Sequence, residues 1–395
     1  MNTTDTVTDK IEEHKRSAQQ AVRGLRDALC ASMVERDAEV EAVLLGLVSQ
    51  QHVLLLGDPG EGKSMLARSF TEAIDGASVF QKLLDKFTFP DECFGPIKLS
   101  AMKEDRCERN VAGYAPTAEI IFADEIFKSS SALLNCWLEL MNERTFDNGG
   151  VKIKCPLRIL VGASNEVPTS ENGRELGAFF DRFLIRRTIK PVSPAGLPRL
   201  LFERLPKVGK VCTMADVDYA AGYSEGLAFS EGAKEKAYQI LAELSGEGIR
   251  PSSRRKVKGV RVAKAAAFMA GEDEVQVIHL ESWMDIMWTD PAQAGKAGEI
   301  VQRIANPVGS KLSAIKQEVH ETLGSMTEGD KAKRLAGLEK LGEIVKACEK
   351  LAAEPGANGQ VLKFKKHVER EVQIHTARAM GLSPERIEAL IGKAE

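Results

Sequence analysis

The stretch Gly57-Asp-Pro-Gly-Glu-Gly-Lys-Ser64 matches the pattern G-x-x-x-x-G-K-[ST] at every defined position. It follows the short apolar run His52–Leu56 and precedes a predicted helix over residues 63–75. A glycine-rich turn lets several backbone N–H groups converge on a phosphate, and the N-terminus of a helix adds a partial positive charge there. The pattern and its context therefore predict a strand, a phosphate-binding loop and a helix, in that order.

The same stretch predicts which residues meet a nucleotide and its metal ion. In loops of this pattern the lysine reaches the β- and γ-phosphates, and the hydroxyl residue binds Mg²⁺. We therefore expect ATP and Mg²⁺ as ligands, with Lys63 at the phosphates and Ser64 at the metal. The residues expected around the nucleotide are Gly57, Asp58, Pro59, Gly60, Glu61, Gly62, Lys63, Ser64 and Met65.

An acidic pair follows a second apolar run. Ile120–Ala123 is followed directly by Asp124 and Glu125. We expect Asp124 on the Mg²⁺ side and Glu125 as the base that orients or polarises the attacking water. Many strands end in an acidic residue, so the pair by itself is a weak signal. The signal becomes strong because the pair comes after the phosphate loop and a further apolar run follows it in the sequence.

Two later residues are candidates with an ordinary alternative each. Asn165 ends the apolar stretch that begins at Leu157, and its amide would lie either between the water and the γ-phosphate or in a simple strand-end turn. Arg182 precedes the run Phe183–Ile185. A guanidinium at a subunit edge can stabilise transition-state charge on a neighbour's nucleotide, whereas the alternative for Arg182 is a surface salt bridge. The residues alone leave both choices open.

Four apolar runs alternate with helical stretches, namely His52–Leu56, Ile120–Ala123, Leu157–Val161 and Phe183–Ile185. Such alternation predicts an α/β core in which helices cover a parallel sheet. Prolines near residue 192 and a change to helical composition end the core. We expect an α/β nucleotide-binding domain with N-terminal helices at 1–192, an all-helical lid at 193–305 and a helical C-terminal region at 306–395. The predicted helices cover residues 8–50 (two helices), 129–142, 229–245, 253–270, 309–351 and 361–392.

The composition is that of an ordinary globular protein. The 395 residues are 43% hydrophobic and 28% charged, with a net charge of −3. No stretch approaches the roughly 20 apolar residues of a membrane span, and the first residues show no signal peptide, so we expect a soluble cytoplasmic protein. Seven scattered cysteines without a C-x-x-C pair predict buried free thiols, not a zinc site or a disulfide framework.

The motifs GDPGEGKS, IIFADE, ASNE and FFDRFLIR, in this order, resemble those of the AAA+ ATPases and in particular of the MoxR family. The segments Phe89–Ser100, Gly113–Glu125 and Met141–Gly149 resemble the RavA-like subgroup of that family. The resemblance extends over about residues 10–300. After about residue 305 the chain departs from it, because the predicted tail is short and helical where full-length RavA-type proteins carry an extended, partly β-structured insertion.

This resemblance implies roles for the candidate residues. Gly57–Ser64 would be the Walker A loop, and Asp124 with Glu125 the Walker B pair. Asn165 would be sensor 1 and Arg182 the arginine finger that acts in trans. The sensor 2 arginine of the lid would be Arg254, although the adjacent Arg255 could take that place. The family forms hexameric rings that typically work with von Willebrand factor A domain proteins as chaperone-like remodelling or maturation machines.

Three further features each have a functional and an ordinary interpretation. Residues 250–264 contain seven cations and no acid, and no aromatic residues lie between them. Over a nucleic-acid contact, this favours a lid helix whose first arginine meets nucleotide and whose other cations are solvated or pair across a subunit interface. The cations are Arg250, Arg254, Arg255, Lys256, Lys258, Arg261 and Lys264. Residues Lys98–Tyr114 are either a substrate contact, as the family resemblance implies, or a surface connection. The apolar stripe from Leu335 to Leu351 is typical of core packing.

The main hypothesis is thus a Mg²⁺-dependent ATPase that hydrolyses ATP at the subunit interfaces of a ring and remodels a protein client. Its expected partners are other copies of the chain, the client and a von Willebrand factor A domain protein. Two alternatives stay open. One is a nucleic-acid-directed motor of the restriction or helicase-loader type, although the charge balance makes nucleic acid an unlikely partner. The other is a nucleotide-gated binding scaffold.

Overall fold

The computed structural model describes residues 3–166, 173–326, 331–354 and 359–380. The chain forms two compact units, Met1–Gly298 and Glu299–Glu395, and each is described by itself. The division falls inside helix α12 (Ala294–Ala305). Among the described residues no helix is both long and apolar enough to cross a membrane.

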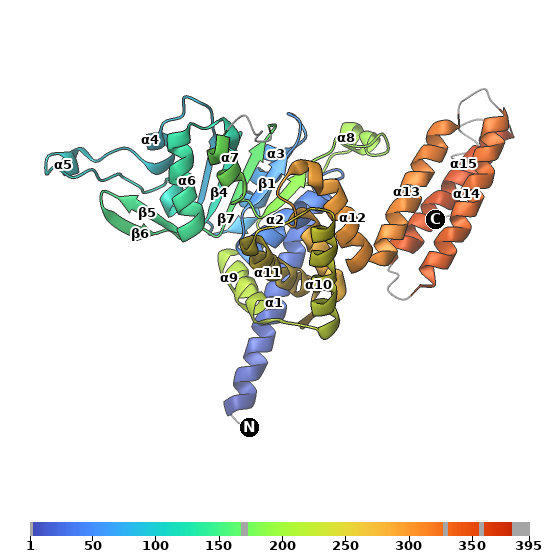
Figure 1. Cartoon of the computed structure of the whole chain (residues 1–395), viewed down its shortest axis with the longest axis horizontal. Coiled ribbons are helices and arrows are strands. Elements are labelled where there is room, and N and C mark those ends of the chain that lie inside the picture. Colours follow the sequence, from blue (N-terminus) through green and yellow to red (C-terminus); the bar gives the residue numbers. More distant parts are fainter. Residues whose placement is uncertain (1–2, 167–172, 327–330, 355–358, 381–395) are drawn as a thin grey trace. The chain divides into compact units, whose positions relative to one another are not determined.

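A five-stranded parallel sheet forms the centre of the first unit, in the order β3-β4-β7-β1-β8 (Figure 1). The strands are β1 (Val53–Leu56), β3 (Val79–Leu83), β4 (Ile120–Asp124), β7 (Ile159–Ser164) and β8 (Ile185–Thr188). The three inner strands are apolar and buried almost throughout, as expected where helices cover both faces of a sheet. The predicted parallel α/β core is confirmed.

Two strands differ from the expectation. The edge strand β3 was not expected, because it alternates exposed and buried residues and so lacks a continuous apolar run. The last strand begins at Ile185 and not at Phe183. The carbonyl groups of Phe183 and Leu184 instead accept hydrogen bonds from the side chain of Arg255.

The direction of the strands sorts the candidate residues into two groups. The phosphate loop follows β1, the acidic pair ends and follows β4, and Asn165 follows β7, so all three lie at the carboxyl edge of the sheet. His52 precedes β1 and Arg182 precedes β8, which pairs with β1 from Val53↔Ile185 to Leu56↔Thr188. These two residues therefore lie at the amino edge.

Helices and short elements complete the first unit. On the core side they are α1 (Thr3–Ala31), α2 (Asp37–Ser49), α3 (Lys63–Glu72), α4 (Pro90–Phe94), α5 (Leu99–Met102), α6 (Ser131–Glu143), α7 (Gly173–Phe180), η1 (Ala115–Thr117) and η2 (Ile126–Lys128). Helix α5 and the hairpin of β5 (Thr145–Asn148) and β6 (Val151–Lys154) lie at the left end of the core in Figure 1. Arg109, in the segment considered for substrate contact, and Asn148 of β5 hydrogen-bond to each other.

The expected lid region is mostly helical. It contains α8 (Leu197–Phe202), α9 (Met214–Gly226), α10 (Glu231–Gly246), α11 (Ser253–Ala270), η4 (Val277–Asp285) and η5 (Pro291–Gln293). The strands here have two residues each: β10 (Ala228–Phe229) pairs with β11 (Glu274–Val275), and β9 (Cys212–Thr213) pairs with β2 (Ile74–Asp75) of the core. Helix α11 packs against α2, α9 and η4, so its register relative to the core is determined by burial.

The second unit contains α13 (Pro307–Ser325), α14 (Lys331–Ala352) and α15 (Gly359–Ala379). The predicted helical range 309–351 thus holds two helices, and residues 381–392 of the other range lie outside the described residues. The main buried cluster is Val319, Met326, Leu341, Ile344, Cys348 and Val368. The stripe on α14 therefore serves mainly as core, except for the exposed Leu335. Four of the seven free cysteines are buried, while Cys107 is exposed.

Candidate functional site

The phosphate loop turns sharply out of β1 and into α3. Gly62 is the N-cap of α3 and has a φ of 82°, a left-handed conformation that side-chain-bearing residues rarely adopt. A Cβ on Gly57 would lie 2.9 Å from the carbonyl oxygen of Ile189, the residue after β8. The loop therefore needs glycine both to turn and to pass beside the neighbouring chain.

Lys63 lies folded against its own loop. Its Nζ donates hydrogen bonds to the carbonyl oxygens of Gly57 at 2.6 Å and Asp58 at 2.9 Å, and the side chain is buried. Phosphate oxygens are stronger acceptors than carbonyls because they carry charge. The two hydrogen bonds hold the ammonium group at the loop, where the sequence predicts a phosphate.

Ser64 and Asp124 meet across the carboxyl edge of the sheet. The Ser64 Oγ donates a hydrogen bond to Asp124 Oδ2 at 2.7 Å, although the two residues are 60 positions apart. One hydroxyl and one carboxylate beside a phosphate loop are the oxygen ligands that Mg²⁺ takes together with nucleotide phosphates. The donor set fits the expected metal.

Glu125 and Asn165 carry unsatisfied polar atoms. Glu125 has a left-handed φ of 53°, and its buried Oε2 has no hydrogen bond, although Lys128 Nζ lies 3.4 Å away as an ion pair. The Oδ1 of Asn165 is also buried without a hydrogen bond. Buried polar groups in native proteins are normally hydrogen-bonded. Two orphaned oxygens at the same edge of the sheet therefore fit a site for a nucleotide and a water molecule.

A cavity of about 360 Å³ lies at this edge. It is lined by Pro59, Gly60, Gly62, Lys63, Ser64, Met65, Leu83, Asp124 and Glu125. Leu83 was not predicted, because the strand that carries it was not. The remaining expected loop residues, Gly57, Asp58 and Glu61, lie in the same loop outside this lining.

Arg36 is a second residue that the sequence did not reveal. Its guanidinium is 7% exposed, donates to the Glu61 carbonyl at 3.2 Å and pairs with the Glu61 carboxylate at 3.0 Å. Because Glu61 belongs to the phosphate loop, this contact anchors the loop to the chain just before α2. Only its position as the residue before a helix set Arg36 apart in the sequence.

Arg182 and Arg254 lie together, but away from the phosphate loop of their own chain. Arg254 is close enough to lower the pKa of Arg182, after the larger effect of burial. Arg182 follows α7 at the amino edge, whereas the phosphate loop begins after the four residues of β1, about 13 Å along the strand. The structure therefore groups the predicted site residues at two opposite edges.

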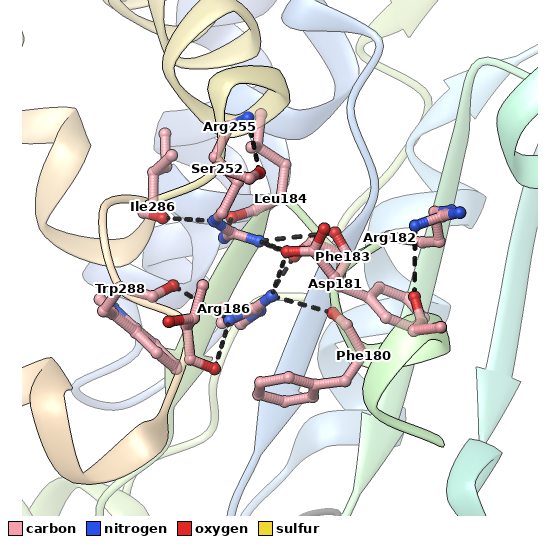
Figure 2. A network of polar contacts seen from close by, with 12 residues as sticks. Phe180, Asp181, Arg182, Phe183, Leu184, Arg186, Ser252, Arg255, Ile286 and Trp288 are labelled. Carbon is pink, nitrogen blue, oxygen red and sulfur yellow. Dashed lines mark hydrogen bonds and ion pairs between the residues drawn. The ribbon is translucent and has the colours of Figure 1, made fainter. Parts of the chain in front are cut away.

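The carboxylate of Asp181, the neighbour of Arg182, pairs with two buried arginines (Figure 2). Arg255 Nη1 donates to Asp181 Oδ1 at 3.1 Å, and Arg186 Nη2 lies 3.4 Å from the same oxygen. Arg255 also donates to the carbonyl of Ile286 at 2.8 Å, and Arg186 to that of Trp288 at 3.1 Å. Both guanidiniums are 1% exposed. Arg255 is therefore buried and engaged in contacts within its own chain.

Arg254 contrasts with its neighbour. It is exposed, and within the described part of the chain no hydrogen bond or ion pair engages it. Two consecutive residues of α11 point about 100° apart around the helix, so one enters the core–lid contact while the other stays outside. Of the two candidates for the lid arginine, Arg254 is the one whose guanidinium is exposed.

A comparison with protein families finds a match in the first half of the chain. Residues 20–208 match the family described as the MoxR domain in the MoxR-vWA-beta-propeller ternary systems. This range contains the phosphate loop, the acidic pair, Asn165 and Arg182, while Arg254 lies beyond it.

Curated proteins are similar over longer ranges. The uncharacterized protein MJ0812 of Methanocaldococcus jannaschii is 37% identical over 286 residues, which cover 71% of this chain and 75% of that protein. The uncharacterized protein MJ0079 of the same organism is 32% identical over 342 residues, 83% of this chain and 84% of that protein. The chaperone MoxR1 of Mycobacterium tuberculosis is 30% identical over 166 residues, 41% of this chain and 42% of that protein.

Among solved structures, a protein of Cytophaga hutchinsonii that is provisionally described as an ATPase has a TM-score of 0.61. The match covers 75% of this chain and 97% of that chain, at 18% identity. A likeness at this identity shows the fold alone, and it confirms the expected fold class. These matches do not reach the RavA-like subgroup, which stays a prediction.

Proposed function

We propose that this chain, which belongs to the MoxR-type AAA+ ATPases, hydrolyses ATP at the interfaces between its subunits in a ring. One observation carries the proposal: the predicted site residues occupy two opposite edges of the sheet. Lys63, Ser64, Asp124, Glu125 and Asn165 lie at the carboxyl edge and Arg182 with Arg254 at the amino edge. Two copies of the chain would bring both sets to one nucleotide.

At the carboxyl edge each residue has a separate task. Mg²⁺, held by Ser64 Oγ and Asp124, would neutralise charge on the β- and γ-phosphate oxygens. Lys63 would turn its Nζ from the loop carbonyls to the phosphates. Oε2 of Glu125, which has no hydrogen bond, would accept a proton from the attacking water, or orient it, and the Asn165 amide would hold that water near the γ-phosphate.

At the amino edge Arg182 would act on a neighbour's nucleotide. A guanidinium delivered in trans stabilises the charge that develops on the transferred phosphoryl group, and in GTPases this is worth about 10³- to 10⁵-fold in rate. The buried Arg182 Nε has no hydrogen-bond partner in the described residues. Such a donor is available to a phosphate oxygen from another subunit.

The partners belong to the same proposal. We propose a hexameric ring, located in the cytoplasm, that remodels or matures a protein client together with a von Willebrand factor A domain protein. The description of the matching family, which names MoxR-vWA systems, and the printed name of the chaperone MoxR1 support this role. We also keep the division into a nucleotide-binding domain at 1–192, a lid at 193–305 and a C-terminal region at 306–395.

Mixing two inactive variants tests the shared site. Glu125→Gln should abolish turnover while a fluorescent ATP analogue still binds, and Arg182→Ala should also lose turnover. When the two are mixed, an Arg182→Ala subunit keeps an intact carboxyl edge and receives Arg182 from its Glu125→Gln neighbour, so activity should return. Arg250→Ala, an exposed lid arginine, serves as the control and should stay active alone.

Three results would contradict the proposal. Wild-type turnover by Glu125→Gln would refute the assigned chemistry. A strictly monomeric chain with full activity would refute the trans arginine, as would a mixture that is no more active than its components.

The alternatives predict other outcomes. A nucleic-acid-directed motor needs a continuous basic surface, but Arg255 is buried and Arg261 pairs with Glu225 at 3.1 Å. Turnover stimulated by DNA, with binding that weakens steeply as salt rises, would still support that motor. A nucleotide-gated scaffold would hydrolyse ATP slowly, with a single-turnover rate that a client does not change.

A further inference from the structure

Lys258 stands on α11 among positive charges at the amino edge of the sheet. We call Arg182, Arg254 and Lys258 the edge cations. Arg254 and Lys258 are four residues apart on α11, so they lie on the same face of the helix. The charge of Lys258 lowers the pKa of the buried His52 that precedes β1. The charge of Arg144, whose Nη1 lies 2.8 Å from His52 Nε2, lowers the pKa of Lys258. These groups therefore share one region of the structure.

Among the described residues no carboxylate is left to balance the edge cations. Asp181 is the acid whose charge acts on Arg182, but the buried guanidiniums of Arg255 and Arg186 already engage it (Figure 2). Within the residues that the structure describes, no hydrogen bond or ion pair engages Lys258 or Arg254, and Arg182 donates only to the Ala178 carbonyl.

The remaining charged groups around Lys258 add positive charge. Arg261, on its own helix, is paired with Glu225, and Arg144, from the core, donates to the carbonyls of Gln50 and Arg158. Burial and the charges of Arg144, Arg254, Arg182 and Arg261, in that order of size, together lower the pKa of Lys258 to about 8. Half-buried cations without a counter-charge are unfavourable unless an anion joins them.

The described residues supply no anion to the edge cations. The edge cations lie at the amino edge, while the phosphate loop that would hold this chain's own ATP lies at the carboxyl edge. Arg182 is the residue proposed above to reach a neighbour's nucleotide. Lys258 shares its surroundings with Arg182, so the same anion would meet both.

We propose that Lys258 is a third cation, with Arg182 and Arg254, in a site that binds the triphosphate of ATP held by the phosphate loop of a second copy of this chain. This inference rests on the proposed function and assigns a binding role to a residue that the sequence motifs did not single out. A bound triphosphate favours the charged form of Lys258. The site weakens when the free lysine loses its proton, above about pH 8.

The test compares Lys258→Met with Lys256→Met. Lys256 is exposed on the same helix, two residues away, and therefore on a different face. For assembled protein, Lys258→Met should lower kcat/KM for MgATP by about tenfold, the range of one charge-assisted contact, while Lys256→Met should leave it unchanged. As isolated subunits, both variants should bind a fluorescent ATP analogue as the wild type does, because the chain's own loop is untouched.

A pH profile separates contact from packing. Lys258→Arg keeps a permanent charge, so the ratio of its kcat/KM to that of the wild type should rise between pH 7 and 9. A constant ratio, or equal values for Lys258→Met and Lys256→Met, would overturn the proposal.

A second measurement does not depend on turnover. Sedimentation measures the ATP-dependent association of Glu125→Gln subunits. When these subunits also carry Lys258→Met, association should need about tenfold more ATP. Unchanged association together with lost binding of duplex DNA would make the site a nucleic-acid contact and overturn the inference. If mixing Arg182→Ala with Glu125→Gln subunits restores activity while Lys258→Met behaves as wild type, the proposed function stands and this inference alone fails.

Discussion

Asp181 Oδ1 accepts a hydrogen bond from the buried Arg255 Nη1 at 3.1 Å, across 74 positions of sequence. The contact joins the end of α7 in the core to the start of α11 in the lid region. Arg182 is the next residue after Asp181, and Arg254 is the residue before Arg255. This ion pair therefore lies next to both Arg182 and Arg254 and helps to hold them in place.

We expect Asp181→Asn to lower the free energy of unfolding by about 3 kcal/mol, because it leaves two buried guanidiniums without a carboxylate. The shift of the urea midpoint at pH 7 measures this loss. Asp218→Asn is the control, since Asp218 pairs with Arg158 at 2.7 Å near the surface, where such pairs contribute about 0–1 kcal/mol. Equal midpoints for the two variants would show that the buried ion pairs of Asp181 contribute no more to the free energy of unfolding than the surface pair does.

Substitutions of the adjacent Arg254 and Arg255 should have different effects, one on activity and the other on stability. Arg255→Ala removes contacts to Asp181 and to the carbonyls of Leu184 and Ile286, and should destabilise the chain by about 3 kcal/mol or more. Arg254→Ala should leave the unfolding midpoint within about 0.5 kcal/mol of wild type and reduce kcat/KM for ATP. Urea unfolding and steady-state turnover on both variants check this, and the opposite pattern would make Arg255 the lid arginine.

Arg36→Met should weaken ATP binding. The substitution removes the two contacts to Glu61 that anchor the phosphate loop, so the loop must be ordered at the moment of binding. We expect KM for ATP to rise about five- to tenfold, as for one lost charge-assisted contact, with a smaller change in kcat. Arg26→Met removes a more exposed ion pair to Glu41 on the neighbouring helix and should change KM by less than about twofold.

Acid should destabilise the chain through His52. Its Nδ1 accepts from the Leu160 N–H at 3.0 Å, so in the neutral ring Nε2 carries the hydrogen and faces the Met141 carbonyl. A second proton would face that N–H group. Burial is the largest cause that holds the pKa of His52 well below 6.5, followed by the charge of Arg144.

The sign follows from proton linkage. Below pH 6.5 the unfolded chain binds a proton at His52 that the folded chain does not, so this stabilisation is present above pH 6.5 and is lost as pH falls toward the depressed pKa. The urea midpoint should therefore fall from pH 7 to 5, and fall less steeply for His52→Gln. His320→Gln, at an exposed position, should keep the wild-type slope. An unchanged slope for His52→Gln would contradict the assignment.

The local motifs could be predicted because their chemistry is contiguous. The phosphate loop needs glycines, a lysine and a hydroxyl within eight residues, and the flanking strand and helix are coded beside it. The acidic pair follows its own buried strand, and a parallel sheet brings such strand ends to one edge. The sequence alone therefore determined the parallel α/β fold, the loop and the candidate residues at the carboxyl edge, except for Leu83.

Only the tertiary structure decided what lies at the amino edge. Arg254, Arg255 and Lys258 look alike in a run of seven cations, and their roles depend on how α11 is rotated against the core. Burial of one face of α11 carries Arg255 into the contact with Asp181, while Arg254 and Lys258 stay outside. That rotation is set by packing between segments far apart in the chain, and no local pattern encodes it.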